Sequence, residues 1–454
     1  MAHARDEDAA RTPEHAVGVD GASTAPGAGA LGAAGPPRRH DPYRALRFRD
    51  FRLLLLSVFI GSCGQQMLTV ALGWELYSRT GSALVLGGVG LAQVIPLIVL
   101  SLPAGHVADR SSRKHIALSA QIVLALAALG LAVLSAQRGA LLLIYGCLVL
   151  MGSAQAFAGP ASSALVAQVI PAAVYENATS WRSSAGQLSA VLGPAAGGVL
   201  LGWWHGALGI YGLNALAALV VALLLAVLRV RPPQGRGAAG TTLRSLGEGL
   251  RFLAHTPVLL AAITLDLFAV LLGGATTLLP IYAKDILQVG PLGLGWLQAA
   301  SAAGAVGMAL VLAHRPPFRR AGRTLLLAVA GFGGATIVFG LSRWFWLSLL
   351  MLAALGALDN ISVVIRSTLV LLRTPDALRG RVGAVNALFI GTSNQLGGFE
   401  SGLAAQLVGP VAAVVAGGVG TLLVVLLVAW RWPQLRRLRT LSEAGQAAGH
   451  DRIA

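Results

Sequence analysis

Four charged residues lie inside otherwise apolar segments of the chain, where an unpaired charge costs several kcal/mol. They are Asp266, Asp359, Arg366 and Glu400. A carboxyl group in so apolar a setting favours its protonated form, so it can take up and release a proton. Asp359 and Glu400 are the leading candidates for proton coupling, and Asp266 is the third. Arg366 follows Asp359 by seven residues, which places both on one helical face about 10 Å apart. A structural ion pair of Arg366 with Asp359 or Asp266 is the equally weighted alternative.

Uncharged polar side chains inside the same kind of segment are candidates to line a cavity for a small molecule. They are Gln65, Gln66, Gln155, Asn360, Asn394 and Gln395. Each of them could instead form a hydrogen bond between helices, which is the slightly favoured interpretation for any one residue. Arg182 lies near the end of an apolar segment, and its long side chain is expected to reach the membrane surface.

Several kinds of chemistry are excluded by what the sequence lacks. Neither Lys114 nor Lys284, the two lysines, follows a glycine, so there is no phosphate-binding P-loop. The nine histidines fall in tails, loops and segment ends, which gives no support for a metal cluster or a proton relay of histidines. Cys63 and Cys147 both lie in apolar segments, so we expect no disulfide framework. Without a nucleophile–base motif, we expect no enzyme, and neither a cofactor nor a metal.

The elements that must position these residues are long apolar helices. Of the 454 residues, 56% are hydrophobic and 11% are charged, whereas a soluble domain carries about 25% charged residues. An apolar helix of about twenty residues crosses a bilayer core of about 30 Å. Such segments occur at about 53–76, 83–104, 115–136, 140–165, 178–202, 207–229, 258–281, 291–313, 322–341, 344–371, 381–406 and 409–431. The predicted fold class is an all-α polytopic membrane protein with twelve transmembrane helices in two groups of six.

The basic residues are distributed very unevenly between the two sides of the membrane that these segments define. With the N-terminus inside, twenty-eight Arg and Lys fall on the inner side. The outer side has only Arg79, Arg138, Lys284 and Arg343. Cytoplasmic loops of membrane proteins carry such an excess, so both termini are predicted to be cytoplasmic. This bias and contacts with anionic lipids explain the net charge of +16 better than nucleic acid does.

The apolar segments divide the chain into two similar halves. We predict a disordered cytoplasmic tail at 1–45, a six-helix bundle at 46–229, a cytoplasmic linker with an amphipathic helix at 230–256, a second bundle at 257–432 and a cytoplasmic tail at 433–454. The first tail has no apolar core, so a signal peptide is not expected. A shift of 204 residues places Pro171 over Pro375, Gly193 over Gly397 and Gly198 over Gly402. The halves are therefore predicted to be parallel repeats about an axis along the membrane normal.

A charged stretch between the second and third apolar segments contains the most specific motif. Residues 105–114 read Gly-His-Val-Ala-Asp-Arg-Ser-Ser-Arg-Lys and are expected to form a tight loop. The stretch resembles the loop between helices 2 and 3 of the major facilitator superfamily, with Ser112 where that family usually has glycine. The resemblance implies a cytoplasmic latch that stabilises the outward-open state, formed by Gly105, Asp109, Arg110, Arg113 and Lys114. Asp109 would face the positive start of helix 11, near Gly380. A solvated loop that only fixes topology is the alternative.

A glycine-rich stretch in the fifth segment resembles the helix-5 motif of antiporters in the same superfamily. Its residues are Gly186, Gly193, Pro194, Gly197 and Gly198. The spacing from Gly186 departs from the longer glycine pattern of those antiporters. The resemblance favours export over import, and a seam of close helix packing is the alternative.

Two further stretches, Trp74–Ser82 and Arg379–Ala384, resemble the enterobactin-exporter and macrolide-efflux-like branch of the superfamily. The likeness covers about residues 45–435. It implies alternating-access export of a small amphipathic molecule, a siderophore or drug, by proton antiport across a bacterial inner membrane. The expected partners are the substrate, protons and membrane lipids, and the protein is expected to act as a monomer without nucleic acid. The alternatives are a facilitator-type importer or lysophospholipid flippase, and a non-transporting membrane sensor or assembly protein.

Overall fold

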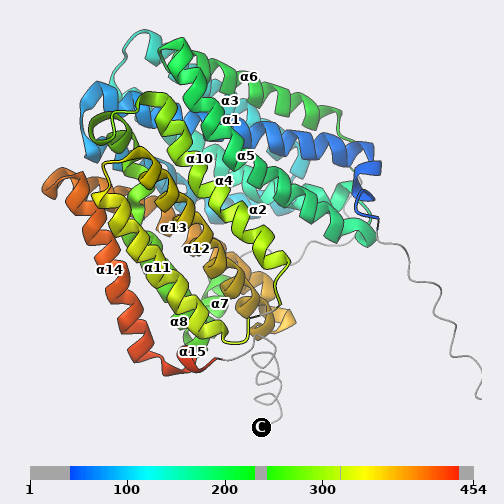
Figure 1. The fold of residues 1–454 in the computed structure, drawn as a ribbon. Helices are drawn as coiled ribbons and strands as arrows, with labels where there is room; N and C mark the ends of the chain where they lie inside the picture. Colours follow the sequence, from blue (N-terminus) through cyan, green and yellow to red (C-terminus); the bar gives the residue numbers. More distant parts are fainter. Residues whose placement is uncertain (1–40, 231–242, 317, 439–454) are drawn as a thin grey trace, which may run out of the picture. The chain divides into compact units, whose positions relative to one another are not determined.

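The computed structural model describes residues 41–230, 243–316 and 318–438, and this part of the chain contains helices and no strand. The first half holds η1 (Ala45–Arg47), α1 (Arg49–Thr80), α2 (Ala83–Arg110), α3 (Arg113–Ala136), α4 (Leu141–Val169), η2 (Ala172–Val174), α5 (Tyr175–Trp204) and α6 (Leu208–Val227). The second half holds α7 (Leu243–His255), α8 (Pro257–Leu272), η3 (Gly274–Leu278), α9 (Leu279–Ile281), the π-helical turn η4 (Tyr282–Ile286), α10 (Gly290–Ala313), α11 (Ala321–Leu341), α12 (Phe345–Arg373), α13 (Asp376–Val408), α14 (Pro410–Arg431) and α15 (Pro433–Arg437) (Figure 1).

Twelve long helical segments confirm the predicted fold class. Among the described residues, eleven are long and apolar enough to cross a membrane, and α8 through η4 count together as one of them. The twelfth is α13, which has 33 residues and packs along α2 and α8. Its polar side chains, such as Asn394 and Glu400, make it less apolar than the others. Helices suit this environment because each satisfies its own backbone hydrogen bonds where no water is available.

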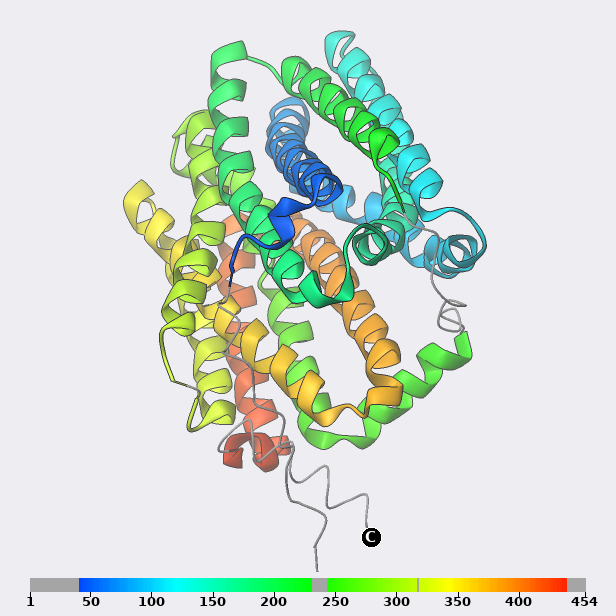
Figure 2. The same cartoon turned by 90° about the vertical axis from the view of Figure 1, so that its right-hand side faces the viewer.

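The helices form two bundles that meet along two pairs of helices. In the first bundle α1 packs on α5 and α6, and α3 packs on α4 and α6. In the second bundle α10 packs on α12, and α11 packs on α12 and α14. The bundles meet where α2 runs beside α13 and α5 beside α10 (Figures 1 and 2).

The described buried side chains form one apolar cluster shared by both bundles at one end of the molecule and two separate clusters at the other. We call the end where α1 finishes and α2 starts the Tyr77 end, and the end where α2 finishes and α3 starts the Asp109 end. At the Tyr77 end one apolar cluster includes Leu76 and Leu201 of the first bundle and Leu294 of the second. At the Asp109 end each bundle has a cluster of its own, around Phe51 in the first and Leu259 in the second.

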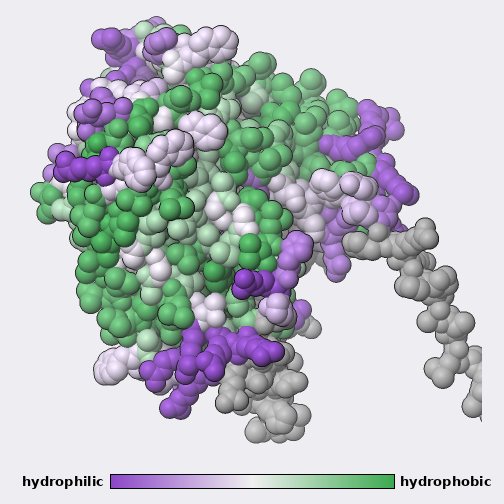
Figure 3. Space-filling view, viewed as in Figure 1, coloured by the Kyte–Doolittle hydropathy of each residue, from purple (hydrophilic) through white to green (hydrophobic). Residues whose placement is uncertain are grey.

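The outer surface of the helices is largely apolar, as a lipid-facing surface must be. Leu126, Leu219, Leu327 and Leu423 are each more than half exposed. Figure 3 shows apolar residues covering the visible face between groups of hydrophilic residues at opposite ends. The exposed apolar side chains are thus explained by the surrounding hydrocarbon and need no protein partner.

Three sequence expectations differ from the structure. The expected loop at 105–114 is only the connection Ser111–Ser112, because α2 continues to Arg110 and α3 begins at Arg113. Hydropathy marks where the chain leaves the bilayer, and a helix can continue into water beyond that point. The described edges of both expected tails are more structured than predicted: Ala45, the last residue of the first tail, and Leu435, within the second, are both buried. Residues 1–40 and 439–454 of those tails lie outside the described part of the chain.

The amphipathic linker helix is present as α7, and most of the remaining linker, residues 231–242, lies outside the described residues. Leu253 of α7 is buried, and Leu250 is half exposed. Glu248 pairs with Arg381 near the start of α13. The helix therefore packs against the second bundle at the Asp109 end.

Candidate functional site

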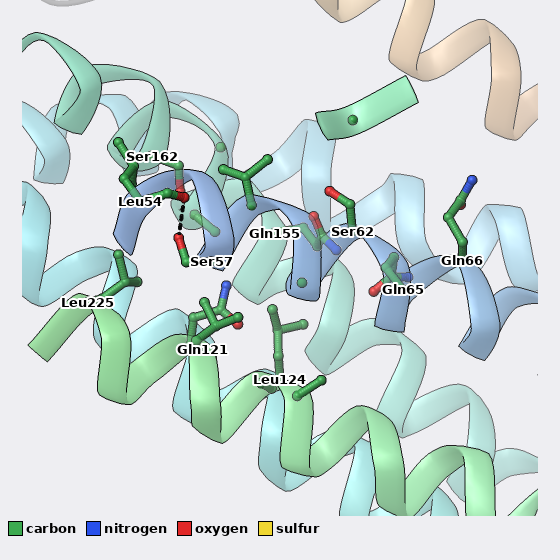
Figure 4. Close-up of a pocket in the computed structure, with 18 of the residues that line it drawn as sticks. Leu54, Ser57, Ser62, Gln65, Gln66, Gln121, Leu124, Gln155, Ser162 and Leu225 are labelled. Carbon is green, nitrogen blue, oxygen red and sulfur yellow. Dashed lines mark hydrogen bonds between the residues drawn. The ribbon is translucent and has the colours of Figure 1, made fainter. Parts of the chain in front are cut away.

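A cavity of about 470 Å³ within the first bundle could accept a small molecule. Its described lining comes from α1, α3, α4, α5 and α6, and Figure 4 shows the side chains that surround it. The polar lining residues are Ser57, Ser62, Gln65, Gln66, Gln121, Gln155, Ser162, Arg182 and Asn214. Apolar side chains such as Leu54, Leu124 and Leu225 complete the wall. A lining of this mixed kind suits an amphipathic ligand.

Some of the predicted cavity residues line this space and others do not. Gln65, Gln66 and Gln155 line it, together with Gly186 of the helix-5 motif. Asn360, Asn394 and Gln395 lie on α12 and α13 of the second bundle and are not among its lining residues. The side-chain amide of Asn394 donates to the carbonyl oxygen of Ile390, one turn back, at 2.8 Å. Their role in substrate binding stays a prediction.

Several polar lining residues were not predicted from the sequence, among them the serines Ser57, Ser62 and Ser162. Gln121 and Asn214 lie in strongly apolar stretches of α3 and α6, and an isolated amide there gives no signal that separates a cavity from a helix contact. Arg182 was expected to reach the membrane surface, but its side chain lines the cavity from the third turn of α5. A charged group near a helix end fits both positions, so the sequence could not decide between them.

The charged residues of the second bundle do not all meet at one point. Arg366 of α12 forms an ion pair with Asp266 of α8, and both side chains are buried. Asp359 lines a void of only about 10 Å³ beside Asp266. One of the two expected ion-pair arrangements is therefore present, with Asp266 rather than Asp359 as the partner. The side-chain oxygen of the neighbouring Asn360 is buried and has no hydrogen-bond partner among the described residues.

Glu400 lies apart from this group, on α13. Its carboxylate accepts a hydrogen bond of 3.3 Å from the hydroxyl of Ser401. The side chain is partly exposed, and no ion pair to Glu400 occurs among the described residues. The carboxyl groups of Asp359 and Glu400 therefore lie within transmembrane helices, and neither has a cationic partner among the described residues. Nowhere in the described ranges do three His, Cys, Asp or Glu side chains group as a metal site requires.

The glycines of the helix-5 motif allow close contact with two different helices. A methyl group on Gly193 would come within 2.6 Å of the β-carbon of Gln66 on α1, and one on Gly197 within 3.0 Å of the α-carbon of Met67. A methyl group on Gly198 would instead come within 2.7 Å of the α-carbon of Gly295 on α10. The backbone oxygen of Pro194 lies against the same glycine of α10. The motif therefore fixes α5 between its own bundle and the other one.

The second helix pair between the bundles is built in the same way. A methyl group on Gly402 of α13 would come within 2.7 Å of the α-carbon of Gly87 on α2. Further along, Gly90 lies against the backbone oxygen of Gln395. Gly402 is the residue that the 204-residue repeat places over Gly198. The two seams are thus related by the internal repeat.

Polar contacts close the Tyr77 end between the bundles. The Tyr77 hydroxyl of α1 donates a hydrogen bond to the Asp285 carboxylate in η4. The ammonium group of Lys284 lies over the Tyr77 ring, 5.4 Å from its centre. The hydroxyl of Ser82, before α2, donates to the side-chain oxygen of Gln406 on α13 at 3.1 Å.

At the Asp109 end, no comparable contact between α2 and α13 is found among the described residues, although these two helices touch at the Tyr77 end. Gly105 lies 22 residues beyond Ala83 on α2, and Gly380 lies 22 residues before Gly402 on α13. Since 22 residues are close to six helical turns, Gly105 lies on the same face of α2 as Ala83, and Gly380 lies on the same face of α13 as Gly402. Each is about 33 Å along its helix from that residue. No described residue lies within 4 Å of where a methyl group on either glycine would stand.

The residues of the predicted latch belong to the helix ends at this side of the first bundle. Gly105, Asp109 and Arg110 belong to the last turns of α2, and the side chains of Asp109 and Arg110 lie outside what the structure describes. Arg113 begins α3. The ammonium group of Lys114 donates to the backbone oxygens of Ala226 and Leu228 at 2.7 and 2.8 Å, so it caps the end of α6. The latch role of these residues stays a prediction.

Twelve long helices in two repeated bundles, joined by paired glycine seams, define the major facilitator fold. A bacterial homologue of the human lysosomal transporter Spinster, inward-facing and occupied, matches with a TM-score of 0.68 and 15% identity over 87% of this chain and 99% of that one. The inward-open xylose transporter XylE from E. coli matches with a TM-score of 0.64 and 15% identity over 88% and 99%.

The chain belongs to the transmembrane secretion effector family, whose model matches residues 40–447. The multidrug efflux pump Tap of Mycolicibacterium fortuitum is 28% identical over 407 residues, which are 86% of this chain and 97% of Tap. The enterobactin exporter EntS of Shigella flexneri is 30% identical over 404 residues, 86% of this chain and 93% of that protein. This protein is therefore a membrane transporter of the major facilitator superfamily and not an enzyme.

Proposed function

We propose that the protein exports a small amphipathic molecule across a bacterial inner membrane by alternating access, in exchange for protons. The observation that carries the proposal is the joining of the bundles at the Tyr77 end and their separation at the Asp109 end. Such a pair of bundles can rock about its seams and expose a cavity to each side in turn. The similarity to Tap, an efflux pump, and to EntS, an exporter, supports the outward direction.

The sidedness follows from the distribution of basic residues. Twenty-eight of the Arg and Lys residues fall on the side of the Asp109 end and of both termini, against four on the other side. By the positive-inside rule the Asp109 end faces the cytoplasm. The open end then admits substrate from the cytoplasm, and closure of that end with opening at Tyr77 releases it outside.

Asp359 and Glu400 are the proposed proton carriers. Asp266 is less suited, because Arg366 neutralises its carboxylate directly. Protonation of Asp359 or Glu400 from the outer side would favour the return of the empty carrier, and release of the proton to the cytoplasm would complete the cycle. Substrate and protons thus move in opposite directions.

Everted membrane vesicles test this proposal, because the cytoplasmic face of the protein is then outside. The vesicles are energised until the lumen is acidic, and siderophores, macrolides and amphipathic dyes are added in turn. We expect a substrate of the unmodified protein to make the lumen more alkaline, as read by a pH-sensitive dye. Asp359→Asn or Glu400→Gln should abolish this response.

Glu176→Gln is the matched control, since it removes an exposed carboxylate at the start of α5 and should leave the response unchanged. Each variant is compared at equal amounts of inserted protein. Retention of substrate-dependent proton movement in both Asp359→Asn and Glu400→Gln would refute their role as carriers. Absence of export by the unmodified protein would refute the proposed function.

A further inference from the structure

Arg182 occupies an unusual position in the cavity of the first bundle. It is the only charged side chain among the described residues that line the cavity. It lies seven residues into α5, about 10 Å along the axis from the first residue of this helix. No ion pair or hydrogen bond links its guanidinium to another described residue. A guanidinium group cannot lose its proton in such a site, so it requires an oxygen-rich or anionic partner.

The acidic groups among the described residues do not line this cavity, and Asp50 and Glu176 of the same bundle lie in the first turns of α1 and α5 outside it. Asp266, Asp359 and Glu400 belong to α8, α12 and α13, in the other bundle. Glu75, on α1, pairs with Arg79 at the Tyr77 end. Among the described lining residues of the cavity there is no Asp or Glu. The cavity is therefore positively charged, although it lies within an apolar bundle.

The rest of the polar lining is rich in amides. Gln65, Gln121, Gln155 and Asn214 contribute side-chain amides from four different helices. Within the described ranges none of these amides forms a hydrogen bond with another residue. Each amide can donate and accept, and polar groups withdrawn from bulk water are normally satisfied by a partner. These four amides can therefore form hydrogen bonds with a bound ligand, or with water when no ligand is bound.

We propose that this cavity binds the anionic group of an amphipathic ligand, a carboxylate or a related oxyanion, through the guanidinium of Arg182. Gln121 and Gln155 form hydrogen bonds with its other polar atoms, and Leu54, Leu124 and Leu225 contact its apolar part. The ligand is the exported substrate, so this inference rests on the proposed function and specifies its substrate class. The same oxyanion could belong to a soluble molecule or to the head group of an anionic lipid.

Binding of matched dansyl probes tests the proposal without requiring transport. The purified full-length protein is placed in phosphatidylcholine nanodiscs and titrated with dansylglycine, a carboxylate, and with its neutral methyl ester. Energy transfer from tryptophan to the dansyl group reports binding, and Trp181 is adjacent to Arg182 in the sequence. Since a charge-assisted hydrogen bond contributes about 1.5–3 kcal/mol, the acid should bind about tenfold to a hundredfold more tightly than the ester.

Variants assign the preference to the guanidinium. Arg182→Gln should remove the preference for the acid, and Arg182→Lys should restore part of it because the charge returns without the planar fork. Arg343→Gln removes an exposed cation outside the cavity and should leave the preference intact. Equal affinity for acid and ester, no saturable binding of the acid, or a preference that survives Arg182→Gln would overturn the proposal.

A second set of nanodiscs, containing phosphatidylglycerol, distinguishes the two sources of the anion. If the site accepts a lipid head group, phosphatidylglycerol weakens binding of the acid to the unmodified protein and has no such effect on Arg182→Gln. If the site accepts a soluble anion, the affinity is unchanged by phosphatidylglycerol. Either result supports an anion site at Arg182 and identifies its natural occupant.

The vesicle assay separates failure of this inference from failure of the proposed function. Binding that depends on Arg182, together with no export of any compound, would refute export and leave the anion site standing. Export by the unmodified protein, together with equal affinity for the acid and its ester, would refute the anion site and leave export standing.

Discussion

The ion pair between Asp266 and Arg366 is the most deeply buried charged contact among the described residues. The exposed fractions of the two residues are 6% and 4%. It links α8 to α12 and stands beside the void that Asp359 also lines. A pair of this kind contributes little net stability over two apolar groups, but the loss of one partner leaves the other charge buried and unpaired.

Removing only the cation should therefore destabilise the protein strongly. We expect Arg366→Met to lower the free energy of unfolding by about 3–5 kcal/mol, as measured by denaturant titration in detergent. The double variant Asp266→Asn with Arg366→Met should recover most of this loss, since no unpaired charge remains. Arg343→Met, at an exposed position, is the control. A double variant as unstable as the single one would show that the pair acts through packing and not through charge.

For single residues, the sequence identified the charged side chains inside the membrane better than it predicted which of them form ion pairs. Intramembrane charges stand out because burial is costly, so Asp266, Asp359 and Arg366 were evident. The seven-residue spacing made Asp359 an equal candidate to pair with Arg366. That spacing describes one helix, however, and the choice of Asp266 depends on which face of α12 meets α8.

The glycine seams are the features that allow one helix of each bundle to approach a helix of the other. Gly198 against Gly295 and Gly402 against Gly87 bring the backbones of neighbouring helices into direct contact. In a membrane such contact supplies much of the packing energy between helices. The seams also limit how the bundles can move, because a side chain placed there would separate the helices.

A larger residue at Gly402 should open the Tyr77 end. We expect Gly402→Val to push α13 away from α2, since even a methyl group would stand 2.7 Å from the α-carbon of Gly87. Spin labels at Ser82→Cys and Gln406→Cys should report a longer distance by electron–electron resonance. Gly146→Val on α4, where no described residue lies within 4 Å, should leave that distance unchanged. An unchanged distance in Gly402→Val would show that the seam is not a pivot.

The elements themselves were largely predictable, whereas the connections between them were less so. Twelve segments and the 204-residue repeat followed from apolarity and glycine spacing, and the repeat correctly paired Gly198 with Gly402. The partners of these glycines, Gly295 and Gly87, were not predictable, because glycine carries no side chain that favours one neighbour. The end of α2 was misplaced because charged residues are as compatible with a helix in water as with a loop.

Across the whole molecule, the contacts at the Tyr77 end link the two bundles, and under the proposed alternating access they would belong to one of two arrangements. The Tyr77 hydroxyl, the Asp285 carboxylate and the Lys284 ammonium group meet at a π-helical turn. Such turns interrupt a regular helix and often occur at functional sites. The contacts form only when the bundles are closed at this end, so they favour the arrangement described here over its alternative.

Loss of the hydrogen bond between Tyr77 and Asp285 should shift the balance toward opening at this end. We expect Tyr77→Phe to raise the ratio of open to closed molecules about tenfold to a hundredfold, because a hydrogen bond to a charged group is worth about 1.5–3 kcal/mol. The same spin-label distance measures this ratio. Tyr145→Phe is the control, since it loses a hydrogen bond of 2.8 Å to Val85 within one bundle. If Tyr77→Phe and Tyr145→Phe changed the ratio of open to closed molecules equally, the Tyr77 contact would have no role in gating.

The anion site proposed at Arg182 would also determine which force drives the proposed cycle. If the cargo is a monoanion, one proton entering and one anion leaving carry two charges in the same electrical sense. An inside-negative potential then supplies about 5 kcal/mol per 100 mV, twice the value for a neutral cargo. A pH difference of one unit adds only about 1.4 kcal/mol per proton. The voltage across the membrane, more than its acidity gradient, would set how far such a carrier can concentrate its cargo outside the cell.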